Sequence, residues 1–354
     1  MYLFVLAVYR GDDPIIYIDY VKNYFFNFLL FTIFLSERVK KKYQVSTYVN
    51  FIVVLTLIQA LLGLLQYYIP EISDFFKIVT YERYGKTELA IAQQFKSEQV
   101  VTGTLLAMQN LSSFLLLNII FLGCIKYFKI YKIGNSVYWV IIFSIATMLL
   151  TGVRAPLLGL FISFFAILWF ANKKLFLFTT VIAFVVLPIL VTSISSLIEY
   201  STTAAAGNNF ENPLIRILGI FAIFDSNLLG NTTLSRSMEL IQYLFQNPIF
   251  GFGPGFIFSG YSFSDAFLIL LTIEFGLLGV FILILPYIIT LKIIKKKCTE
   301  KEYTVSVILF ITALSQSIVN EGLWTWYTNL QFFLMMMLLL RVNVKNLNYK
   351  LKLA

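Results

Sequence analysis

Nine long runs of apolar residues, separated by polar segments, limit the folds open to this chain of 354 residues. Most runs approach the ~20 residues that a helix needs to cross a bilayer, and the shortest are marginal. Backbone polar groups in lipid must be satisfied internally, which favours helices. We therefore expect an all-α polytopic integral membrane helical bundle with about 9–10 spans, forming a single membrane domain over residues 1–354. The runs lie near residues 20–36, 48–69, 103–123, 136–153, 155–171, 174–197, 265–291, 303–320 and 326–341.

Composition supports this class and narrows the chemistry. The chain is 59% hydrophobic and 13% charged, with a mean hydropathy of +0.83, values typical of polytopic membrane proteins. It has no histidine and only two cysteines, so we expect no metal site and no cofactor. Any proton transfer must use another ionisable side chain.

The basic residues concentrate in every second connection. Segments 37–47, 124–134, 172–174, 292–302 and 341–354 hold 18 of the 27 basic residues but only 3 of the 18 acidic ones. The positive-inside rule places these segments, and with them the C-terminus, in the cytoplasm. The same placement explains the net charge of +9 without nucleic acid as a partner. Both cysteines fall on this side, so we expect no disulfide.

Two long segments then lie on the outer side. The first outer loop covers about residues 70–102, and the large outer loop covers about 198–264. In the large loop, Asn212-Pro213 is typical of a helix start. A second helix is expected from Ser235 to just before Asn247-Pro248. Its predicted apolar face consists of Met238, Ile241, Leu244 and Phe245. The loop therefore reads as a pair of amphipathic helices that cap the outer side.

A glycine-rich turn at residues 247–256 ends the second of these helices. It contains Gly251, Gly253 and Gly255 together with two prolines, a composition that cannot continue a helix and lets backbones approach closely. Irregular main chain beside a bilayer requires protein or water to satisfy its polar groups. We therefore expect this turn to shape a cavity at the membrane surface. It lacks the lysine and Ser/Thr of a nucleotide-binding loop.

Several motifs resemble the O-antigen ligase and polymerase family, integral-membrane glycosyltransferases that handle lipid-linked surface polysaccharides. The likeness covers about residues 83–291 and is most specific over 147–279. Its elements are Arg236 ahead of the Asn-Pro-x-x-Gly-x-Gly-Pro-Gly turn, Ser264-Asp265-Ala266-Phe267 leading into Glu274-Phe275-Gly276, the arginine-bearing turn Leu150–Pro156, and the fainter Arg83-Tyr84-Gly85 and Gly103-Thr104. Ligases of the family carry a histidine near the position of Asp265, so the departure favours a polymerase of capsule, exopolysaccharide or O-antigen.

The resemblance implies a reaction at the outer face of the bacterial cytoplasmic membrane. The donor would be an oligosaccharide on polyprenyl diphosphate, and the acceptor would be a hydroxyl of another glycan. Arginine binds phosphate oxygens bidentately and stays charged, which suits the departing diphosphate. We assign catalysis to Arg154, Arg236 and Asp265, with Asp265 as the base. Substrate binding is assigned to Arg216, Arg83, Gly251, Gly253 and Gly255. Membrane lipids, chain-length regulators and flippase proteins are the expected partners.

Each candidate also has a plainer explanation. Arg154 and Arg216 could snorkel to lipid phosphates. Arg236 and Arg83 could form solvated ion pairs of small energy, and Asp265 could be an ordinary helix N-cap. A ligase and a lipid-linked oligosaccharide flippase remain alternatives for the whole chain, as does a structural partner without activity. A flippase should show charged residues through its core and repeated halves, and the sequence has neither.

Overall fold

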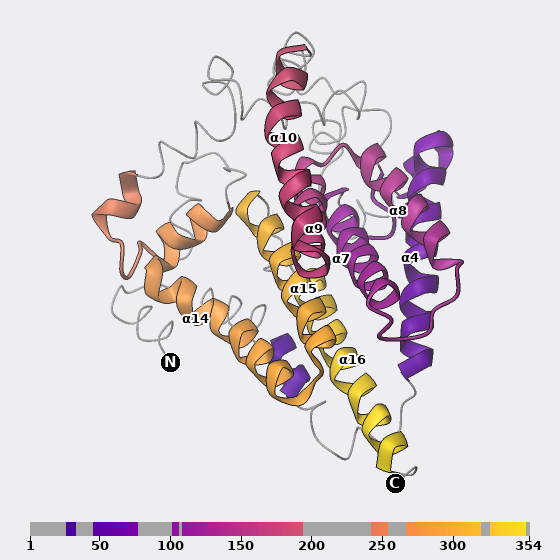
Figure 1. Ribbon diagram of the computed structural model, residues 1–354. Coiled ribbons are helices and arrows are strands. Elements are labelled where there is room, and N and C mark those ends of the chain that lie inside the picture. Colours follow the sequence, from indigo (N-terminus) through magenta and orange to yellow (C-terminus); the bar gives the residue numbers. More distant parts are fainter. Residues whose placement is uncertain are drawn as a thin grey trace. The chain divides into compact units, whose positions relative to one another are not determined.

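The structure is a computed structural model that describes residues 26–32, 45–76, 101–105, 108–193, 242–253, 267–319 and 326–351. These residues form helices and no strand, which confirms the all-α prediction (Figure 1). Within them, four helical segments are long and apolar enough to cross a membrane: Val45–Tyr68, Gln109–Tyr127, Arg154–Ala171 and Leu271–Lys297. Val137–Thr151 and Thr328–Leu340 are shorter apolar helices. The chain is therefore a polytopic helical membrane protein, and the number of 9–10 spans stays a prediction.

The chain divides into two compact units. The first unit comprises Met1–Tyr48, Phe128–Tyr131 and Thr233–Ala354, and the second comprises Val49–Tyr127 and Lys132–Thr232. Each unit is described by itself below. The expectation of a single membrane domain stays a prediction.

Long helices build the described part of the second unit. Helix α4 (Val45–Tyr68), which begins in the first unit, supplies most of its length here, followed by α7 (Met108–Tyr127), α8 (Val137–Thr151), α9 (Arg154–Ala171) and α10 (Lys173–Ser193). Helix α7 packs against α8 and α9, and α9 packs against α10 (Figure 1). Only Asn172 separates α9 from α10, and its side-chain oxygen accepts from the amides of Lys174 (3.1 Å) and Leu175 (3.2 Å). This N-cap lets the chain reverse in one residue.

A polar contact joins α4 to α8 inside this apolar unit. The buried hydroxyl of Thr147 donates to the carbonyl of Ala60 at 2.8 Å. Gly63 makes the approach possible, because a Cβ there would lie 2.5 Å from the methyl group of Thr147. Small residues of this kind are what allow membrane helices to pack closely.

The first unit contains α14 (Phe267–Lys297), α15 (Glu300–Val319) and α16 (Trp326–Leu351). These three helices pack on one another around an aromatic core. Tyr287 of α14 contacts Phe310, Phe332 and Phe333, with ring centroids 5.3 to 6.2 Å apart, and Phe31 joins at 5.7 Å from Phe333. Offset and edge-on ring pairs of this kind add stability beyond the area that they bury.

A capping box starts α15. The carboxylate of Glu302 accepts from the amide of Thr299 at 2.8 Å and from its hydroxyl at 3.1 Å. The spacing is that of the Thr-x-x-Glu signature, in which the third helical residue satisfies the N-cap amide. The turn between α14 and α15 is therefore short and rigid.

The predicted runs agree in outline with the described helices and differ in extent at three of them. Helix α7 begins at Met108, so residues 103–105 of the predicted run 103–123 lie outside it, and it continues to Tyr127. Helix α14 continues to Lys297 and α16 to Leu351, both beyond the apolar runs that suggested them. Lysine and arginine are good helix formers, so a helix that leaves the apolar layer need not end there. Of the predicted first span, residues 26–32 are described and are helical.

Candidate functional site

The turn between α8 and α9 presents Arg154. Helix α8 ends at Gly152, which has a left-handed conformation (φ 64°) and donates its amide to the carbonyl of Leu149 at 3.2 Å. A residue with a Cβ would be strained there. Val153 is extended, and Arg154 is the first residue of α9. The sequence Thr-Gly-Val-Arg thus builds a reversal of two residues between the helices.

Buried hydroxyl groups hold this turn. The Thr151 hydroxyl donates to the carbonyl of Met148 (2.7 Å) and lies 2.6 Å from the hydroxyl of Ser112 on α7. Because the Thr151 proton is already used, Ser112 is the donor of that second bond. The amide of Val153 adds a longer bond of 3.4 Å to the same Thr151 oxygen. Arg154 therefore projects from a backbone that is tied to a neighbouring helix.

The electrostatics at this turn favour an anion. Arg154 is partly exposed, and it stands at the N-terminus of α9, where the helix dipole attracts negative charge. The hairpin order puts this turn at the opposite end of α8 and α9 from Lys126 and Lys173, which lie at the basic ends (Figure 1). This is the end that the charge pattern assigns to the outer side.

A second polar arrangement lies in the same unit, where residues 101–105 precede α7. The side-chain oxygen of Gln66 accepts from the amides of Thr102 (2.9 Å) and Gly103 (2.8 Å), while its NH2 group donates to the Gly103 carbonyl (3.1 Å). Gln59 binds Thr104 through both the backbone amide (3.1 Å) and the hydroxyl (2.6 Å). Both glutamines are buried on one face of α4.

We had not singled out these glutamines from the sequence. Their seven-residue spacing in an apolar span was the available signal, because it places two costly polar side chains on the same helix face. Gly103 is required as well: it has φ 57°, and a Cβ there would lie 2.5 Å from the side-chain oxygen of Gln59. The faint Gly103-Thr104 motif is thus a clasped junction between α4 and α7.

In the first unit, the glycine-rich turn inserts into a break in α14. Gly276 has φ 68° and ψ 175°, which interrupts the helix. In a regular helix, the amides of Leu277 and Leu278 would bond to the carbonyls of Ile273 and Glu274. Here they bond instead to Pro248 (2.8 Å) and Ile249 (3.2 Å) of the turn. The carbonyls of Ile273 and Glu274, which lose these helical donors, accept hydrogen bonds from the turn instead.

The turn returns two donors to the broken helix. The amide of Phe252 binds the carbonyl of Ile273, and the amide of Gly253 binds that of Glu274, both at 2.8 Å. Four bonds between the two segments thus replace two bonds within the helix. Inside the turn, Asn247 accepts from the Gly251 amide (3.0 Å) and its side chain donates to the Gly251 carbonyl (2.6 Å). We call the four backbone hydrogen bonds between the turn and α14 the latch.

Two glycines make the latch possible. A Cβ on Gly276 would clash with the carbonyl of Ile249 and would lie 2.6 Å from the amide nitrogen of Gly251. A Cβ on Gly251 would lie 2.5 Å from the carbonyl oxygen of Glu274. Both residues also have positive φ angles, which favours glycine independently. The two glycine motifs of the sequence are therefore two halves of one backbone contact.

The latch bears on the roles predicted for the glycines. The amides of Gly251 and Gly253 donate to carbonyls of the protein, so they do not point toward a ligand in this conformation. The expectation that these glycines let two backbone segments approach closely is confirmed. A role of these two residues in substrate binding stays a prediction.

Side chains next to the latch form a small apolar cluster. Buried Ile273 packs against Tyr243, Leu244, Phe252 and Ile269. Residues 242–246 are helical and end before Asn247, as predicted. Of the predicted apolar face, Leu244 contacts Ile273, whereas Phe245 is 80% exposed and its place on that face stays a prediction. Tyr243 takes the inward position, because the cluster lies on its side of this short helix.

Glu274 lies beside the break and is 5% exposed. Other predicted site residues, namely Arg83, Arg216, Arg236, Gly255 and Asp265, lie outside the described residues. Arg154 belongs to the second unit and the latch to the first. Within the described residues, no group of three or more potential His, Cys, Asp or Glu ligands gathers as it would around a metal ion.

Comparison with known proteins adds no evidence to that from the residues themselves. No protein family, curated protein or solved structure matches the chain. The resemblance to the O-antigen ligase and polymerase family therefore rests on the motifs quoted above. Among these motifs, the structure describes the Arg154 turn, Gly103-Thr104, the glycine-rich turn as far as Gly253, and Glu274-Phe275-Gly276.

Proposed function

We propose that this membrane protein is a glycosyltransferase that joins oligosaccharide repeat units carried on polyprenyl diphosphate. The observation that carries the proposal is the rigid α8–α9 turn, which holds Arg154 at a helix N-terminus on the end opposite the basic connections. The positive-inside rule disfavours an arginine at that end. A positive charge kept there against this tendency suits an anionic ligand, and the motif around it resembles that of the polymerase family.

The proposed reaction is a displacement at the anomeric carbon of the donor. A hydroxyl of the acceptor glycan forms the new C–O bond, the bond to the diphosphate breaks, and the hydroxyl proton passes to the carboxylate of Asp265. Arg154 binds the departing diphosphate. Hydrogen bonds to charged groups contribute about 1.5–3 kcal/mol each. This contribution speeds the reaction where the bonds strengthen as charge develops on the leaving group.

The remaining assignments follow from the same scheme. Arg236 and Arg216 would share the diphosphate, and the reaction would take place at the outer face of the bacterial cytoplasmic membrane. The C-terminus would be cytoplasmic. The preformed Thr151–Ser112 contact supports the scheme because a positioned cation needs no reorganisation when charge develops.

The test is the size distribution of lipid-linked and surface glycan in cells whose only copy is Arg154→Ala. We expect single repeat units at the outer face and no long chains, with the protein present in the membrane at its normal level. Arg154→Lys should retain a small fraction of polymer, because lysine keeps the charge but not the bidentate geometry. Lys173→Ala, at the opposite end of α9, is the matched control and should leave chain length unchanged.

The same experiment separates the alternatives. Long chains still attached to the lipid carrier would identify a ligase, and repeat units trapped on the inner side would identify a flippase. A normal polymer in Arg154→Ala would remove the main support for the proposal.

A further inference from the structure

The depth of the latch in the membrane follows from its position on α14. This helix has no charged residue from Phe275 to Leu291, and its first lysine is Lys292. Sixteen helical residues from Gly276 to Lys292 span about 24 Å. Measured to Lys295 instead, the span is about 28.5 Å. Both distances are shorter than the ~30 Å thickness of the hydrocarbon layer. Gly276 therefore lies within that layer, close to its outer boundary, when the lysines mark the cytoplasmic boundary.

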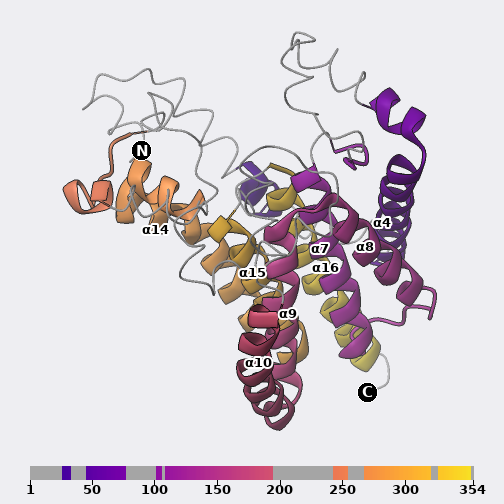
Figure 2. The same ribbon diagram turned by 90° about the horizontal axis from the view of Figure 1, so that it is seen from above.

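The turn lies at the same depth, because the latch bonds join it directly to Leu277 and Leu278. In Figure 1 and Figure 2 the segment 242–253 lies against the bend of α14. Irregular backbone at this depth requires partners for its polar groups. The latch supplies them, since four amides and four carbonyls of the two segments pair with each other. The segment from residue 240 to 253 also contains no charged residue.

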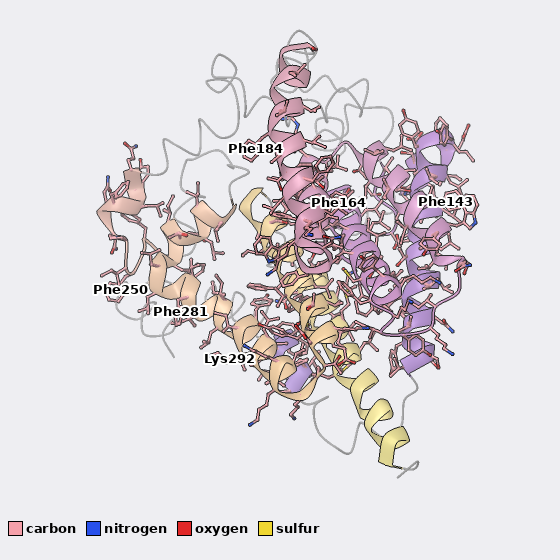
Figure 3. All side chains as sticks on the ribbon, viewed as in Figure 1. Phe143, Phe164, Phe184, Phe250, Phe281 and Lys292 are labelled. Carbon is pink, nitrogen blue, oxygen red and sulfur yellow. The ribbon has the colours of Figure 1, made fainter. Side chains whose placement is uncertain are left out.

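The side chains around the latch are apolar and exposed. Phe245, Ile249 and Phe250 of the turn side are between 48% and 80% exposed. Leu277 (61%) and Phe281 (56%) of α14 are exposed beside them. Figure 3 shows Phe250, Phe281 and Lys292 following one another along this part of the molecule. The exposed surface of the turn is thus continuous with that of a helix that crosses the membrane.

We infer that the glycine-rich turn is embedded in the edge of the hydrocarbon layer, in the leaflet opposite the basic ends. There Phe245, Ile249 and Phe250 bind the acyl chains of bilayer lipids. In water these three side chains would be an unfavourable exposed patch, whereas in lipid they require no further partner. The turn is therefore a lipid-binding element that shares its depth with α14. The inference does not depend on the proposed activity.

The test is site-directed spin labelling in lipid nanodiscs. A nitroxide is placed at Ile249→Cys or Phe250→Cys in a chain with Cys124→Ala and Cys298→Ala. Phe281→Cys is the matched control within lipid, and Lys132→Cys, in the exposed loop before α8, is the matched control in water. Collision with dissolved oxygen and with a water-soluble nickel chelate is measured for each. Two labelled positions in the turn protect the result against a local effect of either substitution.

We expect the labels at 249 and 250 to collide readily with oxygen and poorly with nickel, as the label at 281 should. Leu278, which binds Ile249, precedes Phe281 by three residues, so the label at 249 should be about 4.5 Å shallower. Nickel accessibility equal to that at 132 would place the turn in water and overturn the inference. Low accessibility to both reagents would mean that protein covers the turn, which would overturn it as well.

Discussion

Replacing Gly276 with alanine should open the latch. The new Cβ would meet the backbone of Ile249 and Gly251, which cannot move aside as a side chain could. Opening loses four backbone bonds and lets α14 regain two, a net loss of two bonds at about 1 kcal/mol each. If alanine stays in place instead, it meets those clashes at φ 68° and ψ 175°, a backbone region that is essentially restricted to glycine and costs about 1–3 kcal/mol. We therefore expect the latch to lose about 2 kcal/mol by either route.

Hydrogen exchange measured by mass spectrometry on the protein in nanodiscs gives this value directly. A loss of about 2 kcal/mol corresponds to roughly thirtyfold faster exchange of the turn's latch amides at Phe252 and Gly253 when exchange follows local opening. The amides of Leu277 and Leu278 should change less, because the regained helix bonds them again. Gly123→Ala in α7 is the matched control, because a Cβ there would meet only one atom, at 4.0 Å. It should leave exchange at the latch unchanged. Unaltered protection in Gly276→Ala would refute the reasoning.

Three further predictions concern other parts of the chain. Gln66→Met should leave the two buried amides that the glutamine binds without an acceptor and destabilise the junction before α7 by about 2–4 kcal/mol. Amide hydrogen exchange at residues 102 and 103 should then be faster. Burial, and then the charge of Glu302, raise the pKa of Cys298 to about 12. Its thiolate at pH 8 is therefore roughly a thousandfold scarcer than that of a free cysteine, and iodoacetamide should alkylate it slowly. Glu302→Gln should speed this alkylation. Burial also raises the pKa of Glu302 itself above its ordinary value near 4.5, so the folded protein holds that proton more tightly than the unfolded chain. Stability should fall as pH rises from about 4.5 through the raised pKa, and Glu302→Gln should remove this slope in thermal unfolding.

The helices could be predicted because a bilayer leaves few alternatives for an apolar run. Residues 136–153 and 155–171 were expected as spans, and α8 and α9 occupy nearly the same residues. The break between them was readable as well, since Gly152 and the following arginine interrupt the apolar pattern. Local patterns of this kind can be interpreted from the sequence, because helix formation and helix ends depend on residues only a few positions apart.

The latch was not predictable in the same way, nor was the contact of Gln59 and Gln66 with residues 102–104. The motifs at Gly251 and Gly276 could each be recognised, but nothing in their spacing says that one fills the gap in the other. Likewise, Gln66 binds residues that lie 36 and 37 positions away. Backbone bonds between distant segments leave no side-chain pattern, and the spacing of Gln59 and Gln66 marks a polar helix face without indicating which residues it binds. Both contacts therefore become visible only once the chain is folded.

The latch also determines where this protein can change in length. Gly253 is bonded to Glu274, and Phe267 lies seven helical residues from Glu274, about 10.5 Å away. Gly253 and Phe267, which flank the thirteen residues 254–266, therefore lie near each other. Doubling such a closed loop costs only about 0.6 kcal/mol. Insertions in this interval that keep Gly255 and Asp265 can be accommodated while the register of α14 against the turn is kept.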